Sequence, residues 1–171
     1  GVYGKTAIEK SVREDFTLDP RSSYSISKRF NEIYLASAYQ ETDLESVSLR
    51  YFNVYGDRQD ERMVIPKFME QSLSNKPITV FGSGKQTRDF TYVDDVIKAT
   101  ILVSQESKGS EIFNVCGENE YSIYDLAKKI KSLTSSQSHI KTIDLPDDRY
   151  DFEVERRSGS SEKLFNAINY C

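Results

Sequence analysis

The sequence predicts an α/β fold with parallel pairing of its strands. Short, β-rich apolar runs alternate with longer segments in which apolar residues recur every three or four positions, and this alternation is typical of parallel strands connected by helices. The chain has 171 residues, 37% hydrophobic and 29% charged, so it is long enough to bury a sizeable core.

The predicted helices have recognisable beginnings. Ser22 and Ser23 are good N-cap residues for the first helix, and Ser122 caps the fourth. Asp94 and Asp95 suit the positive N-terminal end of the third. The five predicted helices are Ser25–Gln40, Val64–Asn75, Val93–Ser107, Ile123–Leu133 and Ser160–Asn169.

Four apolar runs rich in β-branched and aromatic residues predict strands. They are Ser46–Asn53, Ile78–Phe81, Glu111–Cys116 and Ile140–Leu145. Residues 1–21 are expected to be irregular, with the end of a strand at Val2–Gly4, and the charged stretch 147–159 is expected to be a loop.

Composition excludes several classes of function. The net charge is -4 and no basic stripe is present, so we expect no nucleic-acid partner. Cys116 and Cys171 are too few and too far apart for a disulfide or metal framework, and His139 is the only histidine. We therefore expect no metal site. No apolar run is long enough to span a membrane and no signal peptide precedes Gly1, so we expect a cytoplasmic protein with no membrane partner.

Tyr24 and Lys28 form the most informative pair of side chains. They lie four residues apart at the start of the first predicted helix, so both can act on one small volume. A nearby cation favours the charged form of a phenol, which could then accept a proton from a substrate hydroxyl. In a chain with 11 tyrosines, however, about one such pair is expected by chance. Tyr124 and Lys128 repeat the spacing and are interpreted as ordinary helix surface.

The flanking sequence strengthens the interpretation of the first pair. The chain resembles the extended short-chain dehydrogenase/reductase family, and more narrowly its nucleotide-sugar epimerases and dehydratases. The blocks that carry the resemblance, in the order of the family, are Val2–Gly4, Tyr24 with Lys28, Leu49–Gly56 and Thr87–Val96. The last two blocks are long and specific. The resemblance covers nearly the whole chain but only about the C-terminal half of the family.

The resemblance implies roles for four residues around a bound NAD. Tyr24 would be the catalytic acid/base, and Lys28 would favour its ionised form and bond the nicotinamide ribose. Phe52 would line the nicotinamide, and Asn53 the substrate phosphates, since an amide can donate to a phosphate oxygen. The alternatives are a surface Tyr and Lys on a helix, and a strand end that merely turns.

The resemblance also implies three substrate contacts. Arg88 would grip the diphosphate of the nucleotide sugar, because a guanidinium pairs bidentately with phosphate oxygens; its alternative is a pair with Asp89. Phe81 would stack near the nucleotide base, and its alternative is core packing. Arg149 would be a second diphosphate contact, and Arg156 and Arg157 are the alternatives for this role.

The chain departs from the family in ways that bear on activity. The glycine fingerprint that binds the NAD pyrophosphate is absent; Gly82 and Gly84 do not fit it. The catalytic Ser or Thr of the family would fall just ahead of Gly1, and the Pro-Gly that often follows the late arginine is missing after Arg149. We therefore expect a fragment that is inactive by itself.

The predicted architecture is the C-terminal part of a doubly wound Rossmann-type domain, residues 1–56 and 88–116, plus a smaller α/β substrate-binding domain, residues 57–87 and 117–171. The predicted parent is an NAD-dependent nucleotide-sugar epimerase, similar to UDP-glucose 4-epimerase and homodimeric, that transiently oxidises a sugar hydroxyl of a nucleotide-diphosphate sugar. The alternatives are a nucleotide-sugar 4,6-dehydratase and a truncated, non-catalytic module for nucleotide-sugar binding or protein interaction.

Overall fold

The computed structural model describes residues 1–4, 11–117, 119–145 and 154–168. The helices are α1 (Ser23–Thr42), α2 (Val64–Leu73), α3 (Val93–Glu106), α4 (Ile123–Leu133) and α5 (Glu162–Ile168). The strands are β1 (Ser46–Tyr51), β2 (Val54–Tyr55), β3 (Ile78–Phe81), β4 (Thr87–Asp89), β5 (Thr91–Tyr92), β6 (Ser110–Val115), β7 (Glu120–Ser122), β8 (Ile140–Ile143) and β9 (Arg156–Arg157).

The predicted α/β class is confirmed. All five predicted helices form, with small differences at their ends, and the four longer predicted strands become β1, β3, β6 and β8. The short strands β2, β4, β5, β7 and β9 were not predicted. The charged loop predicted over 147–159 is wrong at β9, because Arg156 and Arg157 pair beside β4; residues 146–153 of that loop lie outside the described residues.

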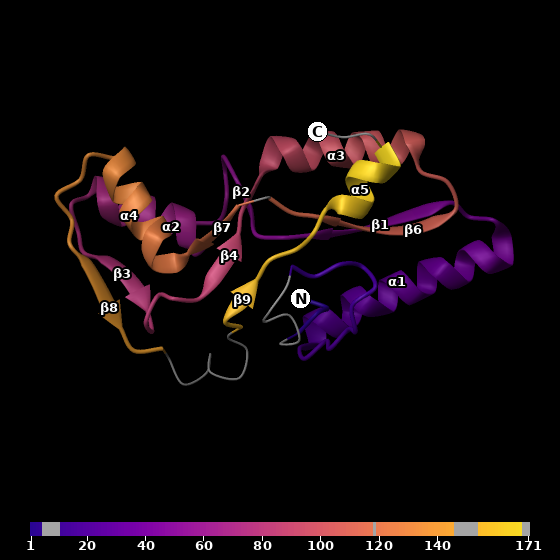
Figure 1. Cartoon of the computed structure of the whole chain (residues 1–171), viewed down its shortest axis with the longest axis horizontal. Coiled ribbons are helices and arrows are strands. Elements are labelled where there is room, and N and C mark those ends of the chain that lie inside the picture. The colour runs from indigo at the N-terminus through magenta and orange to yellow at the C-terminus, as the bar shows by residue number, and fades with distance from the viewer. Residues whose placement is uncertain (5–10, 118, 146–153, 169–171) are drawn as a thin grey trace.

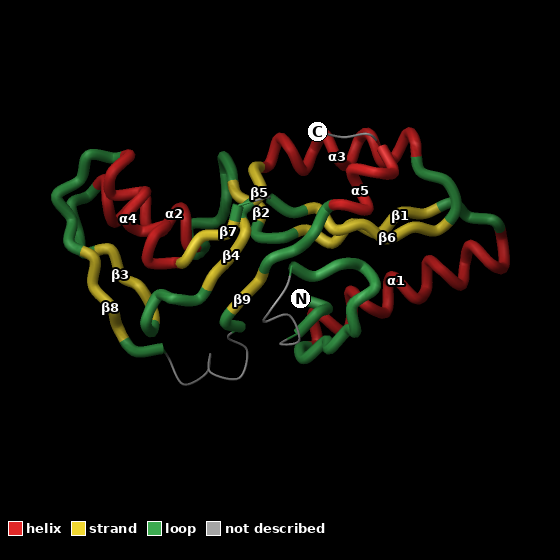
Figure 2. Tube along the Cα trace, in the orientation of Figure 1, coloured by secondary structure: helices red, strands yellow, loops and turns green. Residues whose placement is uncertain are grey.

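The elements form two packed groups joined at the centre of an elongated molecule (Figures 1 and 2). In one group, β1 and β6 pair in parallel, with α1 on one side and α3 and α5 on the other. In the other group, β3 and β8 pair in parallel beside α2 and α4. Between them lie a parallel β2–β5 pair and a three-stranded sheet in the order β7-β4-β9.

Each group has its own apolar core. The side chains of α2, β3 and α4 supply one buried cluster: Phe68, Ile78, Val80, Ile123, Leu126, Ala127 and Ile130. Those of α3, β6 and α5 supply another: Val96, Ala99, Val103, Phe113, Val115, Leu164 and Ile168. Burial of this kind is the main favourable term in folding. The helix α5 is therefore packed on the β1–β6 side of the molecule.

A buried ion pair fixes α1 against β1. The Arg50 Nε and Nη2 atoms donate to the two carboxylate oxygens of Glu32, each at 2.8 Å, and both side chains are only 7% exposed. Arg29 adds a third bond to this carboxylate, from Nη1 at 2.9 Å. Burial raises the pKa of Glu32, but the hydrogen bonds from Arg50 and Arg29 outweigh it and hold that pKa below its usual value.

The same arginine continues into a network that reaches the N-terminal segment and β6. Arg50 Nη1 donates to the Tyr3 hydroxyl at 2.6 Å, and this hydroxyl donates to Asn114 Oδ1 at 2.7 Å. The Asn114 side-chain nitrogen then donates to the carbonyl oxygens of Val12, at 2.9 Å, and Ser160, at 3.3 Å. Segments from both ends of the chain are thereby tied to the β1–β6 pair.

Because α1 presents polar side chains to the sheet, its apolar side faces outward. The residues of α1 that are buried are Ser25 and Glu32. Five large apolar side chains of the helix are more than half exposed: Tyr24, Ile26, Phe30, Ile33 and Tyr34. Ser22 caps the helix, as predicted, and exchanges bonds with Ser25 in a capping box, at 3.1 Å and 2.9 Å.

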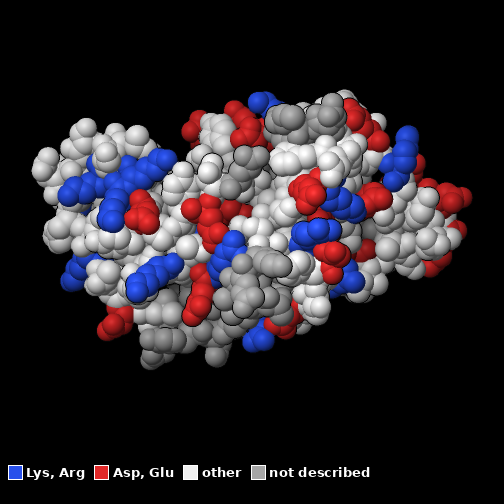
Figure 3. Space-filling view, viewed as in Figure 1, with Lys and Arg blue, Asp and Glu red and all other residues white. Residues whose placement is uncertain are grey.

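The surface carries both signs of charge. On the face shown in Figure 3, acidic and basic side chains are interspersed, apart from a group of Lys and Arg over the region of α2 and α4. Among the helices of the described residues, none combines the length and apolarity needed to cross a lipid bilayer.

Removal of one member of the buried ion pair should be strongly destabilising. We expect Glu32→Ala to lower the free energy of unfolding by about 3–5 kcal/mol, because it leaves Arg50 buried without its counter-charge. Glu41→Ala, at the exposed end of the same helix, should change it by less than about 0.5 kcal/mol. Urea unfolding followed by circular dichroism measures both. Similar losses for the two variants would contradict this role for the pair.

Candidate functional site

The predicted site residues come from elements that meet near the middle of the molecule. The N-terminal end of α1 and the carboxyl ends of β1 and β6 point to the same central region, where β4 also lies (Figure 1). In open α/β sheets, ligands bind outside the carboxyl ends of the parallel strands. The fold therefore places this region where a ligand site is expected.

Tyr24 and Lys28 lie side by side on the first turns of α1. The Lys28 Nζ atom is 5.4 Å from the centroid of the Tyr24 ring, and Tyr24 is 67% exposed. The second pair with this spacing, Tyr124 and Lys128 on α4, has a similar geometry at 4.8 Å. The contact itself does not distinguish the two pairs; their positions do, because α1 begins near the carboxyl ends of β1 and β6, whereas α4 lies in the other group beside α2 (Figure 1).

Phe52 and Asn53 follow the last residue of β1. The backbone N–H of Phe52 donates to the Val115 carbonyl at 3.0 Å, which continues the β1–β6 ladder. A Cβ at Gly159 would lie 2.9 Å from Phe52 Cζ, so glycine there lets the backbone approach the ring. Asn53 has φ 33°, a left-handed conformation that Asn tolerates better than most residues.

Arg88 and Asp89 are the last two residues of β4. Arg88 is 8% exposed, and its Nη1 atom donates to its neighbour's carbonyl, that of Thr87, at 2.7 Å. In the parallel pairing with β9, Arg88 stands opposite Arg157. Successive strand residues point to opposite faces, so Asp89 turns toward the end of β1 and not toward the face that Arg88 occupies.

Asp89 is fully buried and bonds two other segments. Its Oδ1 accepts from Asn53 Nδ2 at 3.2 Å, and its Oδ2 accepts from the backbone N–H of Gly159 at 2.8 Å. Burial raises the pKa of Asp89 to about 6, with a contribution from the neighbouring Glu120 carboxylate, although the two hydrogen bonds act in the opposite direction.

The carboxylate of Glu120 is paired with the guanidinium of Arg156 on β9. Arg156 donates to its carboxylate from Nε at 2.8 Å and from Nη2 at 2.8 Å, and these bonds lower the pKa of Glu120. Thr87 also donates to this carboxylate. The pair joins β7 to β9 across β4.

The remaining predicted contacts lie further out. Phe81 ends β3, and the Lys67 Nζ atom is 5.2 Å from its ring centroid. Arg149 lies outside the described residues. The structure thus hydrogen-bonds Asn53 to Asp89 on β4, the strand that carries Arg88, and places Lys28 beside the Tyr24 ring.

The residues that the sequence interpretation missed are Asp89 and Gly159. Asp89 was considered there only as a partner for Arg88. If Thr87–Asp89 is interpreted as a strand, the alternation of its side chains places Arg88 and Asp89 on opposite faces. No sequence signal identified Gly159. Its role is to donate its backbone N–H to Asp89, which lies 70 positions away along the chain.

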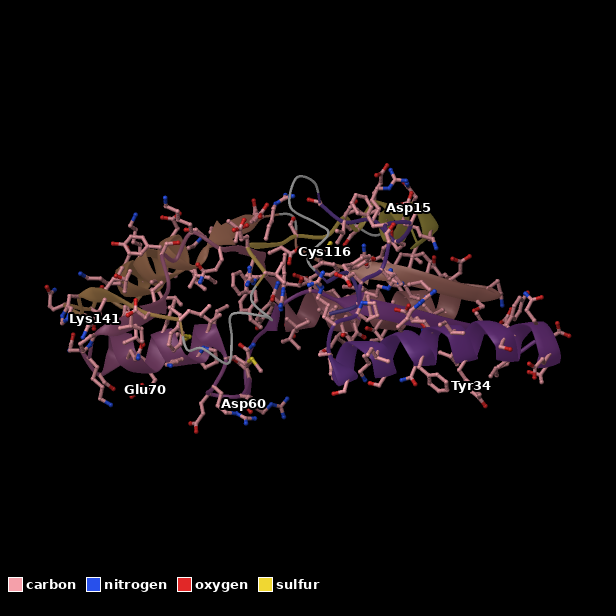
Figure 4. The ribbon with its side chains drawn as sticks, turned by 90° about the horizontal axis from the view of Figure 1, so that it is seen from below. Asp15, Tyr34, Asp60, Glu70, Cys116 and Lys141 are labelled. Carbon is pink, nitrogen blue, oxygen red and sulfur yellow. The ribbon has the colours of Figure 1, made fainter. Side chains whose placement is uncertain are left out.

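A large cavity adjoins this region, since Thr91, which donates to the Phe52 and Asn53 carbonyls, is one of its lining residues. It has a volume of about 960 Å³ and is lined by segments from α2, α4, α5 and the turn after β2, including Tyr55, Met69, Tyr92, Cys116 and Leu164. None of the described site residues predicted from the sequence lines it. Cys116, near the centre of the molecule (Figure 4), is a buried thiol whose pKa burial raises to about 12. The described residues contain no cluster of side chains suited to hold a metal ion.

The parallel β1–β6 pair, with helices on both of its sides, defines an α/β protein of the Rossmann type. The sequence model of the "NAD dependent epimerase/dehydratase family" matches residues 1–116. The chain belongs to this family, which confirms the resemblance found in the sequence.

The relatives catalyse different reactions. A UDP-N-acetyl-alpha-D-glucosaminuronate decarboxylase of Bacillus cytotoxicus is 40% identical over 146 residues, which are 81% of this chain and 45% of the relative. A dTDP-D-glucose 4,6-dehydratase of Homo sapiens is 34% identical over 152 residues, 86% of this chain and 43% of the relative.

A solved structure agrees with the same assignment. The UDP-glucuronic acid 4-epimerase of Bacillus cereus, in complex with UDP-glucuronic acid and NAD, has a TM-score of 0.86 at 30% identity, over 99% of this chain and 53% of the epimerase. The chain thus spans about half the length of the relatives it matches, as the sequence led us to expect.

Titration of Asp89 should give a stability change of known sign. Its folded-state pKa of about 6 lies above the usual value of 3.8, so between these values the folded chain holds a proton that the unfolded chain has released. Stability from this group therefore rises as the pH falls from about 7 to about 5, by roughly 1 kcal/mol. Urea unfolding of the unchanged chain and of Asp89→Asn at both pH values measures the effect.

The difference in unfolding free energy between the unchanged chain and Asp89→Asn isolates the contribution of Asp89. Other carboxylates, including Glu32 and Glu120 with their lowered pKa values, titrate in both proteins and cancel in the difference. A difference in unfolding free energy that does not change with pH would show that Asp89 does not titrate in this range.

Proposed function

We propose that the chain carries the acid/base pair and the substrate-phosphate contacts of an NAD-dependent enzyme that modifies the sugar of a nucleotide-diphosphate sugar, as an epimerase similar to UDP-glucose 4-epimerase. The observation that carries this proposal is the placement of Tyr24 and Lys28 at the start of α1, beside the carboxyl ends of β1 and β6. Family membership supports it.

Tyr24 is the proposed acid/base. Its Oη atom would take the proton from a sugar hydroxyl and later return it, while Lys28, one turn further along the helix and 5.4 Å from the Tyr24 ring centroid, would hold the phenol in place. Because Tyr24 is 67% exposed, its hydroxyl is accessible to a substrate.

The chain has residues that fit NAD, although its 171 residues contain no glycine fingerprint. Lys28 offers ammonium donors for ribose hydroxyls, and Phe52 offers an apolar face at the end of β1. When bound, NAD supplies the acceptor for the hydride of the sugar carbon. The chain's own contribution is to position the sugar between that acceptor and Tyr24.

Asn53, Arg88 and Phe81 are the proposed contacts for the rest of the substrate. Asn53 and Arg88 lie on segments joined through Asp89, and each offers N–H donors suited to phosphate oxygens. Phe81 would stack near the base, and Arg149 would be the second arginine on the diphosphate. Two phosphate contacts on neighbouring segments hold the diphosphate while the sugar reacts.

The second candidate reaction is 4,6-dehydration, favoured by the dehydratase among the relatives. The third is a binding or interaction module without catalysis. A titration with UDP, dTDP and NAD separates these classes: binding of a nucleoside diphosphate without NAD fits either a module or the substrate-holding half of an enzyme. Activity that appears only in a longer chain fits the enzyme.

The division into a Rossmann-type domain, residues 1–56 and 88–116, and a substrate domain, residues 57–87 and 117–171, remains a proposal. It assigns α5 to the substrate side, whereas α5 packs with α3 and β6. A cytoplasmic location is likewise proposed, from the sparse cysteine content, and a homodimeric parent is proposed from the resemblance.

Arg88 should carry much of the affinity for a nucleoside diphosphate. We expect Arg88→Ala to weaken binding of UDP or dTDP about tenfold to a hundredfold, because hydrogen bonds between charged groups are the strong ones. Arg88→Lys should lose less but not recover the original affinity, since an ammonium cannot bind bidentately. Isothermal titration calorimetry measures this, with the exposed Arg62→Ala as the control. Equal affinities for the unchanged chain and Arg88→Ala would remove Arg88 from the site.

The outward side of α1 should drive self-association. Ile26, Phe30, Ile33 and Tyr34 are each more than half exposed, and Tyr34 projects from the outer side of the helix (Figure 4). Exposed apolar patches favour association, so light scattering should show a mass above the monomer that rises with concentration. The double variant Phe30→Asp with Ile33→Asp should lower it.

The matched control changes an exposed leucine elsewhere. Leu133 on α4 is 75% exposed, and Leu133→Asp should leave the mass unchanged. A constant monomer mass up to high concentration, together with a sharp thermal transition, would contradict association through α1.

A further inference from the structure

The amide of Asn53 can serve a phosphate only in one of its two orientations. Its nitrogen carries two donors and its oxygen only accepts. A rotation of the amide by 180° would present the oxygen to the phosphate and repel it. The group that bonds this amide therefore decides which of its atoms faces the substrate, and the buried carboxylate of Asp89 bonds it.

The backbone around Asn53 is already held. The Thr91 N–H donates to the Asn53 carbonyl at 3.4 Å, and the Thr91 hydroxyl donates to the Phe52 carbonyl at 3.0 Å. These bonds fix the main chain of the turn after β1 in its left-handed conformation. They leave the side-chain amide free to rotate about its last bond, so they do not choose its orientation.

Asp89 supplies the missing constraint. An ionised carboxylate only accepts hydrogen bonds, so it selects the nitrogen of the Asn53 amide, at 3.2 Å, and disfavours the oxygen. The second oxygen of Asp89 is bonded to the Gly159 N–H at 2.8 Å, and the whole residue is 0% exposed. The carboxylate therefore cannot turn away without breaking a second bond in the interior.

Asp89 also ties Asn53 to the strand that carries Arg88. The two residues are adjacent in β4, with Arg88 on the opposite face. A shift of Asp89 would therefore move both proposed phosphate contacts together. Holding both proposed phosphate contacts is thus a role for this carboxylate that offsets the desolvation cost of its burial.

We propose that Asp89 is a positioning residue, which accepts one N–H of the Asn53 amide, leaves the second N–H of the same nitrogen for the substrate phosphate, and keeps the amide in register with Arg88. This rests on the proposed function, since it assumes that Asn53 and Arg88 contact a nucleoside diphosphate. The charged and titratable groups around Asp89 on the elements packed against β4 are Glu120 on β7, Arg156 on β9 and the Cys116 thiol after β6.

The first test needs no ligand. The side-chain amide signals of Asn53 in a ¹⁵N-correlated NMR spectrum of the chain should shift with pH, with a midpoint near the pKa of about 6 of Asp89. In Asp89→Asn this titration should vanish, while Asp15→Asn, a change at an exposed aspartate, should leave it intact. An Asn53 amide that does not respond to pH in the unchanged chain would overturn the proposal.

The second test is a double-mutant cycle with UDP and dTDP as the probes. Asp89→Asn and Asn53→Ala should each weaken binding by about tenfold, and the double variant should be no weaker than Asn53→Ala alone, because Asp89 acts through that amide. A residue with a merely structural role would give losses that multiply, and this outcome would overturn the proposal. Circular dichroism at the titration temperature confirms that each variant is folded.

The two tests separate the proposal from the function it rests on. If the unchanged chain binds neither nucleotide, the proposed substrate contacts fail and the idea that Asp89 serves a phosphate site fails with them, even where the NMR titration shows the Asp89–Asn53 bond. If the chain binds and the losses multiply, the function stands and the role of Asp89 does not.

Discussion

The buried pair of Arg50 and Glu32 is the constraint on which the rest of the structure depends. Two charges withdrawn from water are tolerated only with near-complete hydrogen bonding, and here the guanidinium reaches Glu32 on α1 and Tyr3 in the N-terminal segment at once. This requirement fixes the rotation of α1 about its own axis. The polar side of the helix turns to the sheet, and Tyr24 is left exposed at its N-terminal end.

A second buried carboxylate near the proposed site behaves in the opposite way. Glu32 has two guanidinium partners, which hold its pKa below the usual value despite burial. Among the described residues, Asp89 accepts from the uncharged N–H donors of Asn53 and Gly159 and has an acidic neighbour, and burial raises its pKa to about 6. One carboxylate thus stabilises a permanent contact, whereas the other holds a proposed substrate contact and titrates close to neutrality.

The position of these residues suits a scaffold that serves several reactions. The relatives include a decarboxylase, a dehydratase and an epimerase, and the roles proposed here for this chain are to hold the substrate and to move one proton. The choice among reactions must come from residues around the reacting sugar carbons. The chain spans about half of each relative.

The sequence by itself determined the α/β class, the five helices, the caps Ser22 and Ser122 of two of them, and the family, because these depend on local periodicity and on contiguous motifs such as Leu49–Gly56. It did not reveal the short strands β4, β7 and β9, whose pairing is between segments remote in sequence. Nor did it show that the apolar residues of α1 face outward, or that Asp89 bonds Asn53 and Gly159. These features were decided by the tertiary structure, because the hydrogen-bond partners of a buried charged group lie on segments that only folding brings together.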